Sequence, residues 1–221
     1  MKKILLGFIA IGLFTFIGCK HTIIDLDGNT YKTVKIGTQK WMSQNLRTTK
    51  YSEGTPIPNV SDYTQWSNLT TGAWSHYDND SSQYERSYGK LYNWYAVNTN
   101  KLCPTGWHVP TDAEWTLLTD YLAANGYDFE EAKVLKASSG WNHNIGQSGN
   151  GTDDSGWKGL PGGFRDYDGH FFSIGSTGSC WSSSEYDALH AWDRYLDYAN
   201  GSLYRSCPNK RGGFSVRCLR D

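Results

Sequence analysis

The chain has 221 residues, with 21 Lys and Arg against 22 Asp and Glu. This balance argues against a nucleic-acid-binding protein that uses a broad basic surface, and 10 Trp with 15 Tyr argue against an intrinsically disordered chain. A mean hydropathy of −0.60 excludes a protein with many membrane spans. The length fits one domain, with or without a small appendage.

Residues 1–18 have the pattern of a bacterial signal peptide. Lys2 and Lys3 precede an apolar run of about 14 residues, which is too short for a stable membrane span. The run ends in Phe16-Ile17-Gly18-Cys19, which resembles a lipobox, the motif in which a small residue precedes a cysteine that is acylated and becomes the mature N-terminus. A plain secretory signal with a coincidental cysteine is the alternative interpretation.

This pattern predicts lipidation at Cys19, with residues 19–24 as a linker between the anchor and a folded body over residues 25–221. Several acyl chains on one cysteine are enough for stable anchoring. No second apolar run follows, so the membrane is an expected partner only through the lipid. We therefore expect an outer-membrane lipoprotein of the cell envelope, and the side of the membrane that it faces stays open.

Four cysteines follow Cys19, namely Cys103, Cys180, Cys207 and Cys218. An even number in an exported protein favours two disulfides, for which three pairings exist. We favour nested bridges, Cys103–Cys218 outside and Cys180–Cys207 inside, with four free buried thiols as the alternative. No CxxC pair occurs, which disfavours zinc and thioredoxin-type chemistry.

The first part of the body has strand patterns. Ile23–Leu26 and Thr30–Ile36 flank Asp27-Gly28-Asn29, and an Asp-Gly pair between such runs predicts a hairpin with a type I′ turn. Ile36–Met42 predicts another turn and strand. Residues 51–85 are rich in Ser, Thr, Asn, Asp and Gly, and we expect a long ordered loop there that aromatic side chains hold in place.

Helices are predicted in the middle of the chain. An apolar stripe indicates a short helix over Tyr88–Asn98. Thr111-Asp112-Ala113-Glu114 is a capping box, which begins a helix that Asn125-Gly126 ends. A second helix is expected from Asp128 to Lys136.

The last part of the chain, from Trp141 to Asp221, has the pattern of short strands and Gly-rich turns. Asp168-Gly169 and Asn200-Gly201 each predict the tip of a hairpin. No repeated unit and no linker divides this body.

Several separated motifs carry a family resemblance. They occur in this order along the chain: Tyr88-Gly89-Lys90-Leu91-Tyr92-Asn93-Trp94-Tyr95-Ala96-Val97, Cys103-Pro104-Thr105-Gly106-Trp107-His108-Val109-Pro110-Thr111-Asp112-Ala113-Glu114-Trp115, Leu160-Pro161-Gly162-Gly163-Phe164-Arg165, Trp181-Ser182-Ser183-Ser184-Glu185 and Gly213-Phe214-Ser215-Val216-Arg217-Cys218. Together they resemble the Fibrobacter succinogenes major paralogous domain family over residues 25–221. The resemblance implies an exported, often lipid-anchored protein of Bacteroidetes or Fibrobacteres, and it implies no assigned activity. It also makes the bridge between Cys180 and Cys207 less usual than that between Cys103 and Cys218.

A wider likeness bears on the fold. Val109–Trp115 is similar to the helix-start motif of formylglycine-generating enzymes, and Gly213-Phe214 with Arg217 is similar to their last strand. Those enzymes have a C-type-lectin-like fold, in which the two ends of the domain come together. The resemblance thus implies an α+β, C-type-lectin-like domain, with a twisted antiparallel sheet, two or three helices and long ordered loops.

No catalytic residue is predicted, and we expect that the protein is not an enzyme. His108 lies in an apolar context, which favours a packed or hydrogen-bonded residue over a catalytic base. No HExxH, GxSxG, Walker or GxGxxG pattern occurs. Formylglycine-generating enzymes use paired thiols that bind copper(I), but the cysteine spacing here does not let those positions be transferred.

No cofactor is predicted, with calcium as the open alternative. Asp25-Leu26-Asp27-Gly28-Asn29 and Asn150-Gly151-Thr152-Asp153-Asp154 supply clustered oxygen ligands, although Asp-Gly-Asn also suits a tight turn. The Trp-Asn-Asp triplet of calcium-dependent lectins is absent, and Trp181-Ser182-Ser183-Ser184 stands near its expected place.

Aromatic side chains in turn-rich or strand-edge sequence are candidate ligand contacts, because an exposed ring stacks on a sugar face or anchors a protein. The candidates, with nearby charged groups that would orient a ligand, are Trp141, Trp157, Tyr167, Asp168, Trp181, Glu185, Trp192 and Arg194. Most of the Trp could instead form the core. We therefore predict a non-catalytic module that binds glycan or protein at the cell surface, with a structural or assembly component of the envelope, or a formylglycine-generating-type enzyme, as alternatives.

Overall fold

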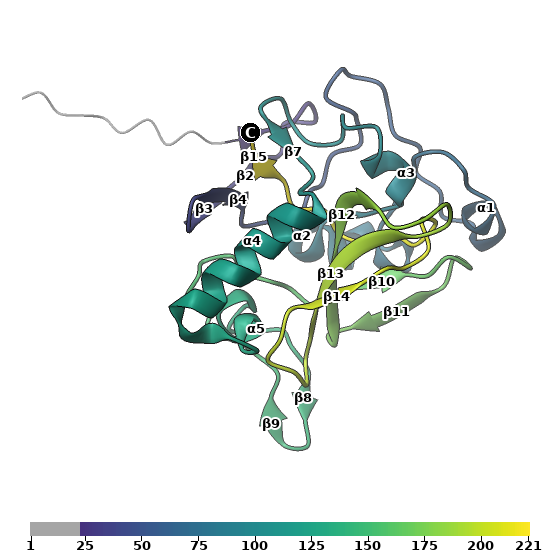
Figure 1. Ribbon diagram of the computed structural model, residues 1–221. Coiled ribbons are helices and arrows are strands. Elements are labelled where there is room, and N and C mark those ends of the chain that lie inside the picture. The colour runs from purple at the N-terminus through teal and green to yellow at the C-terminus, as the bar shows by residue number, and fades with distance from the viewer. Residues whose placement is uncertain (1–22) are drawn as a thin grey trace, which may run out of the picture.

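The computed structural model describes residues 23–221 of the chain (Figure 1). The predicted signal peptide, Cys19 and the first part of the linker lie outside the described residues. Within residues 23–221, no helix is both long enough and apolar enough to cross a membrane. This part of the chain mixes short helices with several sheets, so the α+β prediction is confirmed.

Two larger sheets organise the strands. One has the strand order β3-β4-β15-β7, and the other has the order β11-β10-β12-β13-β14. All neighbours are antiparallel except β10 and β12, and β1-β2, β5-β6 and β8-β9 are separate antiparallel pairs. The strands are β1 (Ile23–Ile24), β2 (Thr30–Tyr31), β3 (Thr33–Ile36), β4 (Gln39–Met42), β5 (Trp74–Ser75), β6 (Leu91–Tyr92), β7 (Trp107–His108), β8 (His143–Asn144), β9 (Gln147–Ser148), β10 (Gly162–Arg165), β11 (Phe171–Ile174), β12 (Thr177–Glu185), β13 (Ala191–Asp197), β14 (Tyr204–Ser206) and β15 (Leu219–Arg220).

More helices form than the two or three that were expected. Within the described residues they are α1 (Tyr63–Ser67), α2 (Ser81–Tyr88), α3 (Trp94–Val97), α4 (Asp112–Leu122) and α5 (Glu131–Leu135), with a 3-10 turn η1 (Tyr77–Asn79) and a π turn η2 (Ala123–Tyr127). The predicted loop over residues 51–85 contains α1 and most of α2. Asp62 and Asp80 cap these helices by accepting hydrogen bonds from backbone N–H groups. The apolar pattern misses them because α2 buries none of its side chains.

The capping box predicted the start of α4 correctly. The Thr111 hydroxyl accepts a hydrogen bond from the backbone N–H of Glu114, and the Glu114 side chain accepts one from the backbone N–H of Thr111. Trp115, Leu118 and Leu122 then face the core, as their spacing predicts. The helical path goes on into η2 and is broken at Asn125 and Gly126, whose φ values are −102° and 90°, as the predicted Asn-Gly stop requires.

Three local predictions need correction. The first hairpin forms between β1 and β2, but only Gly28 of the Asp-Gly pair has a positive φ (81°), so the turn is not type I′. The helix expected over Tyr88–Asn98 shrinks to α3, because Leu91 pairs as a strand and the Asn93 side chain caps the helix after it. The second predicted helix, Asp128–Lys136, begins later, at Glu131.

Two hydrophobic clusters fill the body. In one, Trp181 packs on Phe214 with ring centroids 4.4 Å apart. In the other, Trp115 lies between Trp41 and Trp157, at 4.7 and 5.9 Å. Burial of large aromatic side chains dominates the stability of such a core. Both clusters lie within residues 23–221, so the core of the molecule is formed by the folded body predicted after the linker.

The outer predicted disulfide is present and joins distant parts of the chain. Cys103 and Cys218 are bonded, with their Cα atoms 6.0 Å apart. Cys218 directly precedes β15, which lies between β4 and β7 in the four-stranded sheet. The last strand is therefore fixed to the start of the domain by hydrogen bonds and to residue 103 by a covalent bond.

The predicted Cys180–Cys207 disulfide is wrong, because both residues are free cysteines. Cys180 lies on β12 opposite Arg194 of β13, and Cys207 follows Ser206, the last residue of β14. Strand β13 thus separates the two thiols. Two strand spacings amount to about 9.5 Å, which exceeds the roughly 7 Å between Cα atoms that a disulfide can bridge.

Candidate functional site

Four of the eight predicted ligand residues are buried. Trp141, Trp157, Trp181 and Arg194 are each at most 4% exposed. The indole N–H groups of Trp141 and Trp181 donate to the backbone carbonyls of Gly159 and Tyr92, at 3.1 and 2.7 Å. These three Trp belong to the core, and the prediction that they contact a ligand is wrong.

Arg194 is buried because it ties a strand to a helix. Its guanidinium donates to the carboxylate of Asp112 at 2.7 Å, and Arg205 donates to the other oxygen of that carboxylate at 2.8 Å. Burial would raise the pKa of Asp112, but hydrogen bonds from Arg205 and Arg194 outweigh it and lower the pKa below its usual value. Arg194 therefore fixes β13 to the start of α4 and is not available to a ligand.

The other four predicted residues are accessible and lie on two hairpins. Tyr167 and Asp168 are exposed at the turn between β10 and β11. Glu185 is exposed at the end of β12, and Trp192 is half-buried near the start of β13. The Trp192 ring packs against Tyr186 at 4.7 Å and carries the Arg205 guanidinium above it.

One segment of the chain connects the two hairpin turns. Arg211 donates to the carbonyl of Ser67, the last residue of α1, and its guanidinium lies 5.7 Å from the Tyr167 ring. The preceding Lys210 forms an ion pair with Glu185. We call this region the loop end and define it as α1, the turns 166–170 and 186–190, and the segment 207–213. Figure 1 shows α1 and the tip of the β10–β11 hairpin side by side at one end of the molecule.

The loop end gathers exposed aromatic rings. Tyr63 is 46% exposed, Tyr167 48% and Tyr186 53%, and the ring of His170 stacks on Tyr63 with centroids 4.7 Å apart. Sequence reasoning missed Tyr63 and His170, since nothing in the pattern placed α1 next to the β10–β11 turn. Gly169 allows this approach, because a Cβ there would come within 2.8 Å of the Tyr63 Cα.

A buried guanidinium holds the loop end in place. Arg165 is 0% exposed and donates to the backbone carbonyls of Gly169, Val60 and Ser61, at 2.7, 2.5 and 2.9 Å. Its guanidinium also stacks over Trp66 at 4.2 Å. Burial without a carboxylate partner lowers the pKa of Arg165 to about 10. One side chain thus fixes the turn of the β10–β11 hairpin to the segment that precedes α1.

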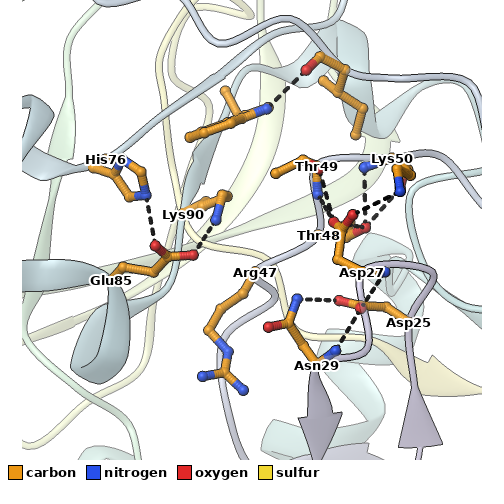
Figure 2. A network of polar contacts seen from close by, with 12 residues as sticks. Asp25, Asp27, Asn29, Arg47, Thr48, Thr49, Lys50, His76, Glu85 and Lys90 are labelled. Carbon is orange, nitrogen blue, oxygen red and sulfur yellow. Dashed lines mark hydrogen bonds and ion pairs between the residues drawn. The ribbon is translucent and has the colours of Figure 1, made fainter. Parts of the chain in front are cut away.

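The carboxylates of the Asp-rich motif in the first hairpin are engaged in hydrogen bonds and an ion pair within the protein (Figure 2). The Asp25 carboxylate accepts hydrogen bonds from the backbone N–H groups of Asp27 and Asn29 and from the Tyr31 hydroxyl. The Asp27 carboxylate accepts from Thr49 and pairs with Lys50 at 3.3 Å. These carboxylates build the turn and attach it to residues 48–50. Among residues 23–221, no group of three His, Cys, Asp or Glu side chains is placed to hold a metal ion, and calcium stays the open alternative to the predicted absence of a cofactor.

A second polar cluster in Figure 2 contains His76, Glu85 and Lys90. Glu85 of α2 pairs with Lys90, whose side chain is 3% exposed, and accepts from His76 at 3.2 Å. The Lys90 ammonium also lies 4.7 Å from the centre of the Trp74 ring. Burial and the charge of Lys90 lower the pKa of His76. The cluster links α2 to β6 and leaves no unpaired charge.

Two further groups that could serve acid–base or thiol chemistry, His108 and Cys180, are not available to a substrate. His108 lies between Glu114 and Asp221, at 2.9 and 2.6 Å, which agrees with the expected hydrogen-bonded role. Cys180 is 5% exposed, and burial raises the pKa of its thiol to about 12. Such a thiol is inert as a nucleophile near neutral pH.

A cavity of about 370 Å³ lies at the start of the described chain, beside the Cys103–Cys218 disulfide. Its lining includes Ile24 and Leu26 of the first hairpin, Lys40 of β4, Trp107 of β7 and Arg220 of β15. The cavity thus opens between the first hairpin and the four-stranded sheet. No sequence motif indicated it, since its lining comes from parts of the chain that are far apart.

Comparison with protein families identifies the chain. The family model of the Fibrobacter succinogenes major domain matches residues 34–220. The chain belongs to this family. No curated protein and no solved structure matches it. The match covers both large sheets and the loop end of this Fibrobacter succinogenes major domain.

The structure also gives the family motifs a physical meaning. Arg165 and Arg217, which belong to two of these motifs, are fully buried and donate to backbone carbonyls. Thr111 and Glu114 form the cap of α4, and Cys103 and Cys218 form the disulfide. These motif residues hold the fold together, while the exposed rings of the loop end lie mostly outside the motifs.

Proposed function

We propose that this protein is a lipid-anchored component of the outer membrane that binds glycan through the loop end and performs no catalysis. The observation that carries the proposal is the set of accessible rings, Tyr63, Tyr167 and Tyr186, at the loop end. Arg165 fixes the backbone near Tyr63 and Tyr167, and the exposed Asp168 follows Tyr167 in the chain. Aromatic faces bind the C–H faces of sugars, and neighbouring polar groups set the orientation. The backbone is pre-organised by Arg165, which lowers the entropic cost of binding.

The order of motifs along the chain supports a C-type-lectin-like architecture as part of this proposal. In that architecture the last strand returns to the beginning of the domain, and β15 here pairs with both β4 and β7. Fold alone does not assign a ligand. The glycan proposal therefore depends on the side chains of the loop end.

The proposal of a non-catalytic role is supported by the state of the reactive groups. The buried Cys180 thiol has a pKa of about 12, and strand β13 separates it from Cys207. A copper(I) site made by two thiols needs them adjacent. His108 has both ring nitrogens bound to carboxylates, so neither is left to accept a proton from a substrate.

The test uses the chain from residue 20 onward on plant, mucin and bacterial glycans. We expect binding to at least one class, and we expect Tyr63→Ala with Tyr167→Ala to weaken it about tenfold through loss of two stacking contacts. Tyr121→Ala is the matched control, since Tyr121 is 43% exposed on α4. Absence of binding to all three classes contradicts the glycan proposal, and crosslinking in cells to one stoichiometric protein would assign the loop end to envelope assembly instead.

A further inference from the structure

The four-stranded sheet carries a row of like charges on one face. Lys35 of β3 is the cross-strand partner of Lys40 of β4. Because Leu219 of β15 is the antiparallel partner of Trp41, Arg220 lies beside Lys40 on the other side. Directly opposed side chains share a face and lie about 5 Å apart at their Cβ atoms. Three cations thus stand next to one another across three strands.

This row has no internal partner in the described residues. Within residues 23–221, Lys35, Lys40 and Arg220 form no ion pair and no side-chain hydrogen bond. Like charges placed directly across strands destabilise a sheet. The mature chain carries an excess of acidic residues, so an unpaired cationic row goes against the overall balance of charge. An external anion would relieve this repulsion.

Apolar side chains surround the row. Ile24 and Leu26 are 59% and 55% exposed, whereas Asp25 between them and Ile23 before them are buried. Both exposed side chains line the 370 Å³ cavity together with Lys40, Arg220 and Trp107. Trp107 is the cross-strand partner of Arg220. We call the set of Ile24, Leu26, Lys35, Lys40, Trp107 and Arg220 the basal surface.

We propose that the basal surface lies on the membrane and binds the headgroups of anionic phospholipids, with Lys40 and Arg220 contacting phosphate and Ile24 and Leu26 entering the interface. This inference rests on the proposed anchoring at Cys19. Ile23 follows Cys19 by four residues, which span at most about 14 Å. The acyl chains therefore hold the basal surface within reach of the lipid headgroups. Cations with neighbouring apolar side chains and a Trp are the combination that binds such an interface.

The position of the basal surface also gives the domain an orientation. In Figure 1 the strands β3, β4, β15 and β7 lie near the start of the described chain, whereas α1 and the β10–β11 tip lie at the other end. A membrane under the four-stranded sheet would leave the loop end directed away from it. The anchor, the cationic row and the proposed glycan surface then fit a single arrangement.

The test is sedimentation of the chain from residue 20 onward with vesicles. We expect binding to vesicles of phosphatidylcholine and phosphatidylglycerol mixed two to one, and much weaker binding to phosphatidylcholine alone. Lys40→Gln with Arg220→Gln should lower the partition coefficient about 25-fold, since each cation near an anionic surface contributes roughly fivefold. Arg86→Gln with Lys133→Gln is the matched control, because both residues are exposed on other elements, α2 and α5.

A second variant tests the apolar part of the surface. Ile24→Ser with Leu26→Ser should weaken vesicle binding without changing its dependence on salt, whereas the Lys40 and Arg220 variant should reduce that dependence. Equal binding to both kinds of vesicle, or equal losses for the cation variant and its control, overturns the proposal. Tight binding of inorganic phosphate alone, with vesicle binding absent, overturns it in favour of a small-anion site.

These outcomes are separable from those of the proposed function. The protein in the vesicle experiment lacks Cys19 and needs no glycan, so a failure there leaves glycan binding at the loop end unaffected. Intact-mass analysis of the protein purified from membranes tests acylation of Cys19 directly. An unmodified Cys19 would remove the anchor. The assignment of the basal surface would then depend only on whether the chain from residue 20 onward binds anionic vesicles.

Discussion

Arg217 and Arg220 lie three residues apart on the same terminal segment, with Cys218 between them. Arg217 is 1% exposed and donates to Asn45 Oδ1 at 2.8 Å and to the backbone carbonyls of Trp157 and Lys158. Arg220 is exposed on β15 beside Lys40 and has no such partner in the described residues.

This difference separates two uses of the same side chain. Arg217 organises loops from the inside, as Arg165 does beneath the loop end. A planar guanidinium can satisfy several carbonyl groups at once, which a lysine cannot do. Arg220 adds a repulsion that the fold does not resolve. We therefore infer that Arg217 stabilises the fold, whereas Arg220 is available to bind an external anion.

The largest expected effect concerns the disulfide at Cys218, which holds both arginines in place. Replacing Cys103 and Cys218 by Ala should lower the free energy of unfolding by about 4 kcal/mol, because the bridge closes a loop with a sequence separation of 115. Urea denaturation measures the change. Cys207→Ala is the control, and its cost should stay below about 1 kcal/mol. A similar loss in that control would indicate that Cys207 is bridged after all.

The next prediction tests the internal role of Arg217. Arg217→Met should lower the free energy of unfolding by about 3 kcal/mol, because Asn45 and two backbone carbonyls lose their buried donors. Arg217→Lys should recover only part of this, since an ammonium cannot reach all three acceptors. Arg220→Met, measured by the same denaturation, should change the value by less than about 0.5 kcal/mol. Equal costs for the two Met variants would remove the contrast.

The sequence predicted this architecture where the signal was local. The capping box of Thr111 and Glu114 fixed the start of α4, and the apolar spacing placed Trp115 in the core. Residues 51–85 gave no such signal, because the Asp62 and Asp80 caps act on helices with few buried side chains. A polar stretch with aromatics is compatible with both a loop and a short capped helix.

The candidate site was predicted only in part, for a different reason. The sequence pattern correctly indicated Tyr167 and Asp168 as accessible residues. It could not show which other side chains are exposed, because the exposure of a side chain depends on what packs against it in the fold. Trp181 is covered by Phe214, and Tyr63 meets His170 across 107 residues of sequence. The unpaired state of Lys40 likewise depends on strand order, since β15 becomes its neighbour only in the folded sheet.

A smaller effect on stability is expected at His108, which lies between Glu114 and Asp221, the residue that follows β15. Burial lowers the pKa of His108, but hydrogen bonds to Asp221 and Glu114 outweigh it and raise the pKa above its ordinary value. The folded state therefore binds the proton more tightly than the unfolded state. This contribution to stability is fully present below about pH 6.5 and is lost as the pH rises through the folded pKa.

The measurement compares the wild type with His108→Gln. The wild type should be more stable by a few tenths of a kcal/mol at about pH 6, and the two should converge at about pH 9. His143→Gln is the control, since His143 is exposed on β8. A gap that is constant across this pH range would mean that the His108 side chain contributes by packing and not by its charge.

The smallest expected effect is a gain in stability at the cationic row. Lys40→Gln removes repulsion from Lys35 and from Arg220 without removing any ion pair in the described residues. The free energy of unfolding should rise by a few tenths of a kcal/mol at low salt, and the gain should shrink as salt screens the charges. Lys133→Gln is the control, because Lys133 pairs with Glu130 at 3.3 Å and its loss should bring no gain. If Lys40→Gln destabilised the protein at every salt concentration, Lys40 would be a structural cation like Arg217, and the basal surface would lose one of the two cations proposed to contact phosphate.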